Sequence, residues 1–477
     1  MQHNDNGARH PRGLYVLFLT EMWERFSYYG MRALLVLYLV NGIDMARHDA
    51  LQVYATYTAF VYLTPILGGY LADRWLGARR AVLVGGLVMA AGHFAMAFPP
   101  LLNVALVLLV LGNGFFKPNI STLVGSLYGP DDPRRDGGFT LFYMGINLGA
   151  FLAPLVCGTL GEKFGWHWGF AAAGVGMLLA VAIFAGGHAT LRHFGRAARR
   201  LRAMDWWLVA SLSLGLVAFT VAGVAGWRHV RDGWLELALW QRGLILFGVI
   251  GAVITQGQFG AARARLTARE WRHITAILLL GLFVVFFWMG FEQAGGTMNL
   301  FALQHTDRML FDWEMPASYF QSLNPLLILL LAPVFSVIFV NLDRSRYALS
   351  APTKMAIGMI LLGLGFVVLA LAAERAEVVG RVSPLWLVLV YLLHTIGELF
   401  LSPIGLSMVS RLAPAQLVSL MMGVWFTAVA VANYLAGTLE ALLQGSGIPL
   451  YWFLVSSSIG AGLVLLVFTP LLRWLMK

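Results

Sequence analysis

The stretch Glu21-Met22-Trp23-Glu24-Arg25-Phe26-Ser27-Tyr28-Tyr29-Gly30-Met31-Arg32 decides how the chain folds. It lies inside an apolar run, 14–41, that is long enough to cross a bilayer, for which a helix needs about 20 residues. At about 100° per residue, one helix face collects Glu21, Glu24, Arg25, Tyr28 and Arg32. A charge at the centre of a membrane helix costs about 2.5–3.5 kcal/mol on insertion scales. We therefore expect this face to line a solvated or paired interior.

The composition identifies an integral membrane protein. Of 477 residues, 59% are hydrophobic and 12% are charged, whereas soluble proteins average about 25% charged. The net charge of +10 comes mostly from arginines between apolar runs, as membrane topology requires, so we do not expect a nucleic-acid partner. The single cysteine, Cys157, excludes an intrachain disulfide.

The apolar runs predict an all-α polytopic membrane protein with fourteen spans. They lie at 14–41, 50–75, 80–99, 102–127, 137–162, 167–189, 204–226, 234–260, 273–303, 317–341, 353–373, 385–411, 416–443 and 448–475. Counted over the loops, about 22 basic residues fall on one side and about seven on the other. The positive-inside rule then places both termini in the cytoplasm.

The arginine runs divide the chain into six, two and six spans. Residues 1–190 and 273–477 would each form a six-helix bundle, and residues 191–272 would hold two extra helices between arginine runs at 192–202 and 263–272. The extra pair carries almost no interior polar groups, so we expect it to be a lipid-facing spacer whose flanking arginines contact anionic headgroups.

Several later spans carry polar residues at mid-depth, where they are expensive in hydrocarbon and are expected to face a cavity. These are Lys117, Asn147, Glu292, Asn324, Glu398 and Ser402. Sorted by charge, the early block supplies Arg25, Arg32 and Lys117, and the late block supplies Glu292 and Glu398. A short zwitterion bridging the blocks would match this polarity. The alternative is ion pairing between helices, for example of Arg32 with Glu292.

The motifs resemble those of bacterial members of the proton-dependent oligopeptide transporter family, in the major facilitator superfamily. The first-helix motif is Glu21-x-x-Glu24-Arg25-Phe-x-Tyr28-Tyr29-Gly30. The other matching stretches are Gly69–Gly77, Phe115–Asn119, Phe139–Gly149, Gly397–Ser407 and Met421–Phe426. The resemblance covers nearly the whole chain, and it implies two six-helix bundles plus the central pair that bacterial members have. It also implies the bacterial inner membrane as the location.

The resemblance implies roles for individual residues. The peptide carboxylate would be held by Arg32 and Lys117, and the ammonium by Asn147, Asn324 and Glu398. Side-chain pockets would be lined by Tyr29, Tyr62, Trp288, Ser402 and Trp425. Proton coupling would use Glu21, Glu24, Arg25, Lys117 and Glu292. One departure stands out, because Ala55 occupies the position of a histidine found in mammalian relatives, so proton coupling must use carboxylates.

We therefore expect a symporter that imports di- and tripeptides with protons by alternating access. Protons would be the coupling ion, with no other cofactor and no metal, since neither a metal-ligand spacing nor a phosphate-binding glycine loop is present. We expect a monomer. Three alternatives stay open: a carrier of nitrate or drug-like compounds, a membrane-embedded enzyme, and a peptide sensor that does not transport. No nucleophile–base pair supports the enzyme.

Overall fold

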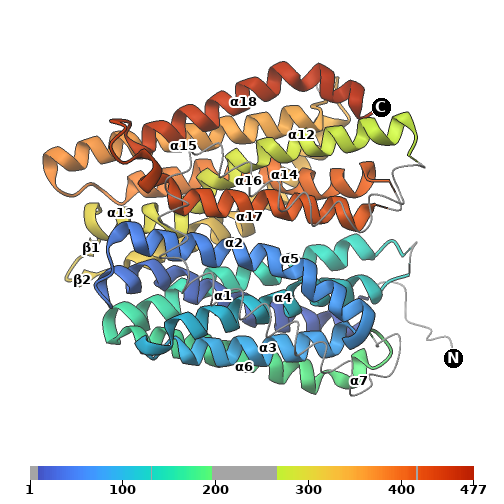
Figure 1. Cartoon of the computed structure of the whole chain (residues 1–477), viewed down its shortest axis with the longest axis horizontal. Coiled ribbons are helices and arrows are strands. Elements are labelled where there is room, and N and C mark those ends of the chain that lie inside the picture. Colours follow the sequence, from blue (N-terminus) through green and yellow to red (C-terminus); the bar gives the residue numbers. More distant parts are fainter. Residues whose placement is uncertain (1–8, 130–131, 196–265, 347, 415–416) are drawn as a thin grey trace, which may run out of the picture.

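The computed structural model describes residues 9–129, 132–195, 266–346, 348–414 and 417–477. Twelve long helices in these ranges form two bundles of six, one from each half of the chain (Figure 1). The predicted two-bundle helical fold is therefore confirmed for the described residues. The two central spans predicted at 204–226 and 234–260 lie outside these ranges.

The first bundle, coloured blue to green in Figure 1, keeps close to the predicted span boundaries. Its long helices are α1 (Arg12–Asn41), α2 (Arg47–Leu71), α3 (Ala78–Ala95), α4 (Leu102–Ser126), α5 (Arg135–Ala153) and α6 (Trp166–Gly186). Short elements extend or join them: η1 (Ala72–Leu76), η2 (Pro99–Leu101), η3 (Pro154–Gly158), η4 (Leu160–Phe164) and α7 (His188–Leu191).

The second bundle, coloured yellow-green to red, lies beside the first (Figure 1). Its long helices are α12 (Ala268–Phe291), α14 (Leu323–Asp343), α15 (Ala351–Val379), α16 (Leu385–Leu412), α17 (Val418–Leu443) and α18 (Leu450–Leu475). Between α12 and α14 the chain forms η6 (Glu292–Gly295), α13 (Thr297–His305), an antiparallel hairpin of β1 (Met309–Leu310) and β2 (Trp313–Glu314), and η7 (Ala317–Ser322).

Nine helical segments of the described ranges are long and apolar enough to cross a membrane. The segments of α1, α2 and α3 do not reach this apolarity, and α1 is the helix that carries the charged stripe. Burial explains how α1 tolerates its charges, since Glu21, Glu24 and Arg25 are all at least 96% buried. This confirms that the charged face of the first helix points to the protein interior.

Glycine contacts bring the helices of the first bundle into backbone contact. A Cβ on Gly68 of α2 would lie 1.9 Å from the carbonyl oxygen of Gly114 on α4. A Cβ on Gly85 of α3 would lie 2.6 Å from the carbonyl oxygen of Gly112. Small residues of this kind let membrane helices pack closely where hydrophobic driving force is weak. They hold α2 and α4 together, and these helices carry Tyr62 and Lys117.

The two bundles meet chiefly where α2 packs on α17 and α5 on α14. We call the end at which α1 begins and α18 ends the inner end, and the opposite end, where β1 and β2 lie, the outer end (Figure 1). The hydrogen bonds that join the bundles gather in the outer half, for example Asn299 Nδ2 to the Ala33 carbonyl at 2.9 Å. In the inner half of α14, Val334, Val337 and Ile338 are exposed. The arrangement is therefore closed at its outer end.

Candidate functional site

The charged stripe of α1 forms one compact cluster. Arg25 Nε lies 2.8 Å from Glu21 Oε1 and 2.7 Å from Glu24 Oε2. Both oxygens of Glu24 and the second oxygen of Glu21 accept no hydrogen bond from the described residues. Two buried carboxylates thus share one guanidinium.

Arg32 joins the two bundles through an ion pair. Its Nη2 lies 2.5 Å from Glu292 Oε2 at the start of η6, and its Nε donates to the hydroxyl of Tyr54 at 2.7 Å. The ion pairing that the sequence left as an alternative is therefore present. Gly295 leaves room for this contact, since a Cβ there would lie 1.9 Å from the Tyr54 hydroxyl and 3.1 Å from Arg32 Nε.

In the part of the chain that the structure describes, Lys117 is a cation without a carboxylate partner. Its Nζ lies 4.3 Å from the centroid of the Tyr62 ring, a cation–π distance. Among the described residues no acidic group lies within ion-pair distance of it, although Glu24 and Glu292 are within electrostatic range. A cation held by an aromatic face alone is free to bind an anionic ligand group.

Glu398 on α16 is the acidic group of the opposite wall. Asn324 Nδ2, on α14, donates to Glu398 Oε2 at 2.8 Å and to Thr395 Oγ1 at 3.1 Å. The other carboxylate oxygen makes no hydrogen bond to the described residues and is not shut off from solvent. Glu398 is thus oriented through one oxygen and has the other available for a ligand donor.

Tyr29 and Arg32 of the first bundle lie near Glu398 of the second bundle. Tyr29 of α1 is within electrostatic range of both Arg32 and Glu398, and its ring lies 5.7 Å from the Arg32 guanidinium carbon. Glu398 is also within range of Arg32 and Glu292. Arg32 of the first bundle therefore lies near Glu292 and Glu398 of the second, whereas Glu21 and Glu24 lie beside Arg25 within the first bundle.

The remaining predicted residues differ in their exposure and in their hydrogen bonds. Tyr62, Trp288 and Ser402 are partly exposed. Asn147 donates to the carbonyl of Tyr143 in its own helix at 3.0 Å, which leaves its amide oxygen available. Trp425 is 4% exposed and packs against Gly405, where a Cβ would lie 2.4 Å from the indole ring.

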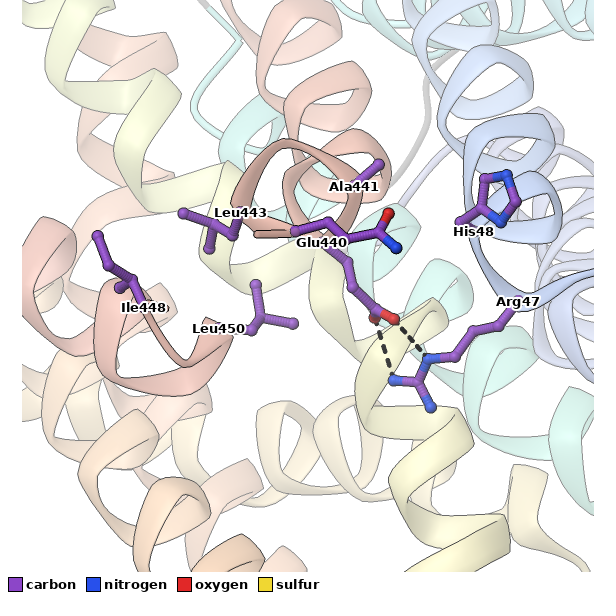
Figure 2. A pocket seen from close by; sticks show the side chains of 8 residues that line it. Arg47, His48, Glu440, Ala441, Leu443, Ile448 and Leu450 are labelled. Carbon is purple, nitrogen blue, oxygen red and sulfur yellow. Dashed lines mark hydrogen bonds and ion pairs between the residues drawn. The ribbon is translucent and has the colours of Figure 1, made fainter. Parts of the chain in front are cut away.

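A second polar feature lies at the outer end. Figure 2 shows Arg47, at the start of α2, and Glu440, near the end of α17, paired through two contacts of 2.8 and 3.1 Å. Arg47 also donates to Gln304 Oε1 at 3.1 Å. Beside the pair is a hollow of about 400 Å³, which we call the outer hollow. Its lining residues are Arg47, His48, Glu440, Ala441, Leu443, Gln444, Ile448 and Leu450.

Outside the membrane-spanning segments, one carboxylate has a clearly shifted pKa. Arg134 donates to both oxygens of Asp132 at 3.0 and 2.9 Å in the loop before α5. These hydrogen bonds lower the pKa of Asp132 to about 2. The described residues contain no group of three or more His, Cys, Asp or Glu that could hold a metal ion.

Comparison with known proteins identifies the family. A family model described as the POT family matches residues 79–448. The chain belongs to the POT family. A peptide transporter, YePEPT, of Yersinia enterocolitica is 39% identical and covers 90% of this chain and 87% of its own. A di-/tripeptide transporter of Lactococcus lactis is 35% identical over 97% of this chain and 96% of its own.

Solved structures of POT family members match the fold as well. A peptide transporter POT in complex with sulfate gives a TM-score of 0.83 at 37% identity, over 98% of this chain and 96% of that one. A family member in complex with a thioalcohol-conjugated peptide gives 0.83 at 32% identity, over 97% of each chain. The chain is thus a multi-span membrane transporter of the major facilitator fold and not an enzyme.

Sequence reasoning missed three contacts of the site and its outer end. One is the contact of Tyr54 with Arg32. A buried tyrosine usually has a hydrogen-bond partner for its hydroxyl, so a tyrosine within an apolar span could have been predicted to bind a polar residue. Arg47, one of the few basic residues on the outer side, pairs with Glu440, and Glu162, at the end of the predicted 137–162 span, accepts hydrogen bonds from Ala317 and Ser318. Nothing local in the sequence pairs these two residues with the other bundle.

Proposed function

We propose that this POT family transporter imports di- and tripeptides together with protons by alternating access. The peptide carboxylate binds Arg32 and Lys117, and its ammonium binds Glu398 with Asn324 and Asn147. The ligand side chains contact the aromatic and hydroxyl residues Tyr29, Tyr62, Trp288, Ser402 and Trp425. Related proteins named as peptide or di-/tripeptide transporters support this substrate class.

One observation supports the proposal: among the described residues Lys117 of the first bundle has no acidic group within ion-pair distance, and Glu398 of the second bundle keeps one oxygen without a hydrogen bond. A dipeptide is a small zwitterion that offers one charge to each of these groups. A charge-assisted hydrogen bond at each end is about twice as strong as a neutral one. Binding of both ends would therefore link the state of one bundle to that of the other.

Proton coupling uses the carboxylates that compete for the same cations. Glu21 and Glu24 share Arg25, close to Lys117, and Glu292 holds Arg32. Breaking one partner of a buried pair leaves an uncompensated charge worth about 3–5 kcal/mol. A shift of about 5.5 kcal/mol moves a two-state balance from 1:99 to 99:1. Protonation of one of these carboxylates, or binding of a peptide carboxylate to the same cation, is therefore large enough in free energy to shift the balance between the closed and the open arrangement.

The transporter lies in the bacterial inner membrane as a monomer with both termini in the cytoplasm. We take residues 1–190 and 273–477 as the two moving bundles, and the two spans expected between them lie outside the described residues. The inner end of Figure 1 then faces the cytoplasm. An inward proton moved across about 100 mV contributes about 2.3 kcal/mol toward uptake.

Competition in proteoliposomes tests this function. Uptake of labelled dialanine under an imposed pH gradient should be blocked by di- and tripeptides, and far less by tetrapeptides or nitrate. Competition by nitrate with no effect of free dipeptides would show a carrier of the alternative kind. Binding of dialanine without any flux would show a sensor.

A further inference from the structure

The segment η4, which continues from α5 through η3 toward the outer end, makes a polar contact with the other bundle. Glu162, on η4, accepts hydrogen bonds from the backbone N–H of Ala317 at 2.8 Å and from the backbone N–H of Ser318 at 3.0 Å. The Ser318 hydroxyl donates a third bond at 2.6 Å. Ala317 and Ser318 begin η7, which runs directly into α14.

Glu162 of the first bundle caps the N-terminal end of η7 in the second bundle. The first N–H groups of a helix lack partners within it, and a carboxylate there also meets the positive end of the helix dipole. Because η7 and α14 are continuous, a carboxylate that fixes Ala317 fixes the outer end of α14. Glu162 thus ties one end of a second-bundle helix to the first bundle.

The chain that follows α5 comes close enough to η7 for this contact because it carries a glycine there. A Cβ on Gly158 would lie 2.0 Å from the Ser318 hydroxyl oxygen, so only glycine permits the contact. The π-helical segments η3 and η4 interrupt the α-helix here, and such segments are frequent at functional sites. One turn away, Thr159 Oγ1 and the Tyr319 hydroxyl lie 2.7 Å apart.

We propose that Glu162 is a positioning residue of the transport cycle, a latch that holds the outer end closed and releases when it opens. Alternating access separates α5 from α14 at the outer end, so all three bonds must break in each cycle. Glu162 is partly exposed, unlike the buried Arg32–Glu292 pair. Water replaces the lost donors at once, which makes the latch reversible. The proposal rests on the alternating access of the proposed function.

A distance measurement tests the latch without any need for transport. Cysteines placed at Phe98 and Val378, which are exposed at the outer ends of the two bundles, would carry spin labels in a Cys157→Ser background in liposomes. Glu162→Ala should raise the ratio of long to short distances about tenfold, corresponding to about 1.4 kcal/mol. Glu162→Gln keeps one acceptor and should give a smaller shift.

A matched variant controls for loss of a carboxylate near the outer end. Glu374 accepts a hydrogen bond from Trp452 Nε1 at 2.8 Å, but both residues belong to the second bundle. Glu374→Gln should therefore leave the distances unchanged. Ser318→Ala removes one of the three bonds and keeps the test available if Glu162→Ala does not fold, with a shift of severalfold.

A second readout separates gating from general damage. Dialanine from outside binds the state in which the outer end is open. If this state is the minor one, a tenfold rise in its population lowers the external dialanine concentration for half-maximal uptake by up to tenfold. Unchanged distances in folded Glu162→Ala and Ser318→Ala, or an equal shift in Glu374→Gln, would overturn the latch. Absence of peptide uptake by the wild type would refute the proposed function instead, and the distances would still decide the latch.

Discussion

Glu398→Gln is the most direct test of how the ligand ammonium is bound. The glutamine keeps the shape of the side chain, and its amide oxygen can still accept the hydrogen bond that Asn324 now donates to Glu398 Oε2 at 2.8 Å. What the variant loses is the charge facing the ligand through the available oxygen. The substitution therefore removes one interaction and leaves the fold of α16 intact.

The size of the effect follows from that single loss. A hydrogen bond to a charged group contributes about 1.5–3 kcal/mol, which corresponds to a loss of about 10- to 150-fold in the affinity for dialanine. N-acetyl-dialanine has no ammonium, so its affinity should change by less than about twofold by the same reasoning.

Calorimetry on the purified protein would measure both ligands with both forms of the transporter. The four dissociation constants form a cycle that isolates the contact between the carboxylate and the ammonium. Glu374→Gln, a carboxylate of the same bundle that faces Trp452, should leave all affinities unchanged. An equal loss of affinity for the free and the acetylated peptide would refute the role assigned to Glu398.

Three further predictions concern coupling, the Arg32 site and the loops. Glu24→Gln and Lys117→Ala should lose uptake driven by a pH gradient but keep peptide exchange between equal solutions; accumulation equal to wild type would contradict their role. Gly295→Ala should weaken uptake at least tenfold, because its Cβ would lie 1.9 Å from the hydroxyl of Tyr54 and 2.6 Å from Cζ of the same ring; uptake equal to wild type would contradict the importance of this contact. The pKa of Asp132 lies at about 2, below its unfolded value of about 3.9, so its stabilising effect is full at neutral pH and is lost only as the pH falls toward 2. Asp132→Asn should therefore leave the pH profile of uptake between about pH 5 and 8 unchanged, and a shifted profile would show that this loop takes part in coupling.

The sequence predicted the helices because membrane burial is a local property. A run of apolar residues must form a helix in hydrocarbon, where every backbone group needs a partner. Both bundles and the inward orientation of Glu21, Glu24 and Arg25 followed from this rule. The small hairpin of β1 and β2 did not, since strands of two residues carry no periodic signal.

The partners of the site residues were harder to predict, because they depend on distances between segments far apart in the chain. Pairing of Arg32 with Glu292 was one of two alternatives from the sequence, and the structure shows this contact at 2.5 Å together with the hydroxyl of Tyr54, which the sequence did not indicate. Lys117 could equally have paired with an acidic group, and its position over the Tyr62 ring is set by how α2 and α4 pack.

In the orientation proposed above, the outer hollow would be reached from outside the cell and would offer a route to inhibition. Its walls come from α2 on one bundle and from α17 and α18 on the other (Figure 2), so its shape changes whenever the bundles separate. A compound with an apolar body against Ile448 and a polar head on the Arg47–Glu440 pair would fit only the closed form. Such a compound would slow turnover without competing with the substrate, and it would not have to cross the membrane.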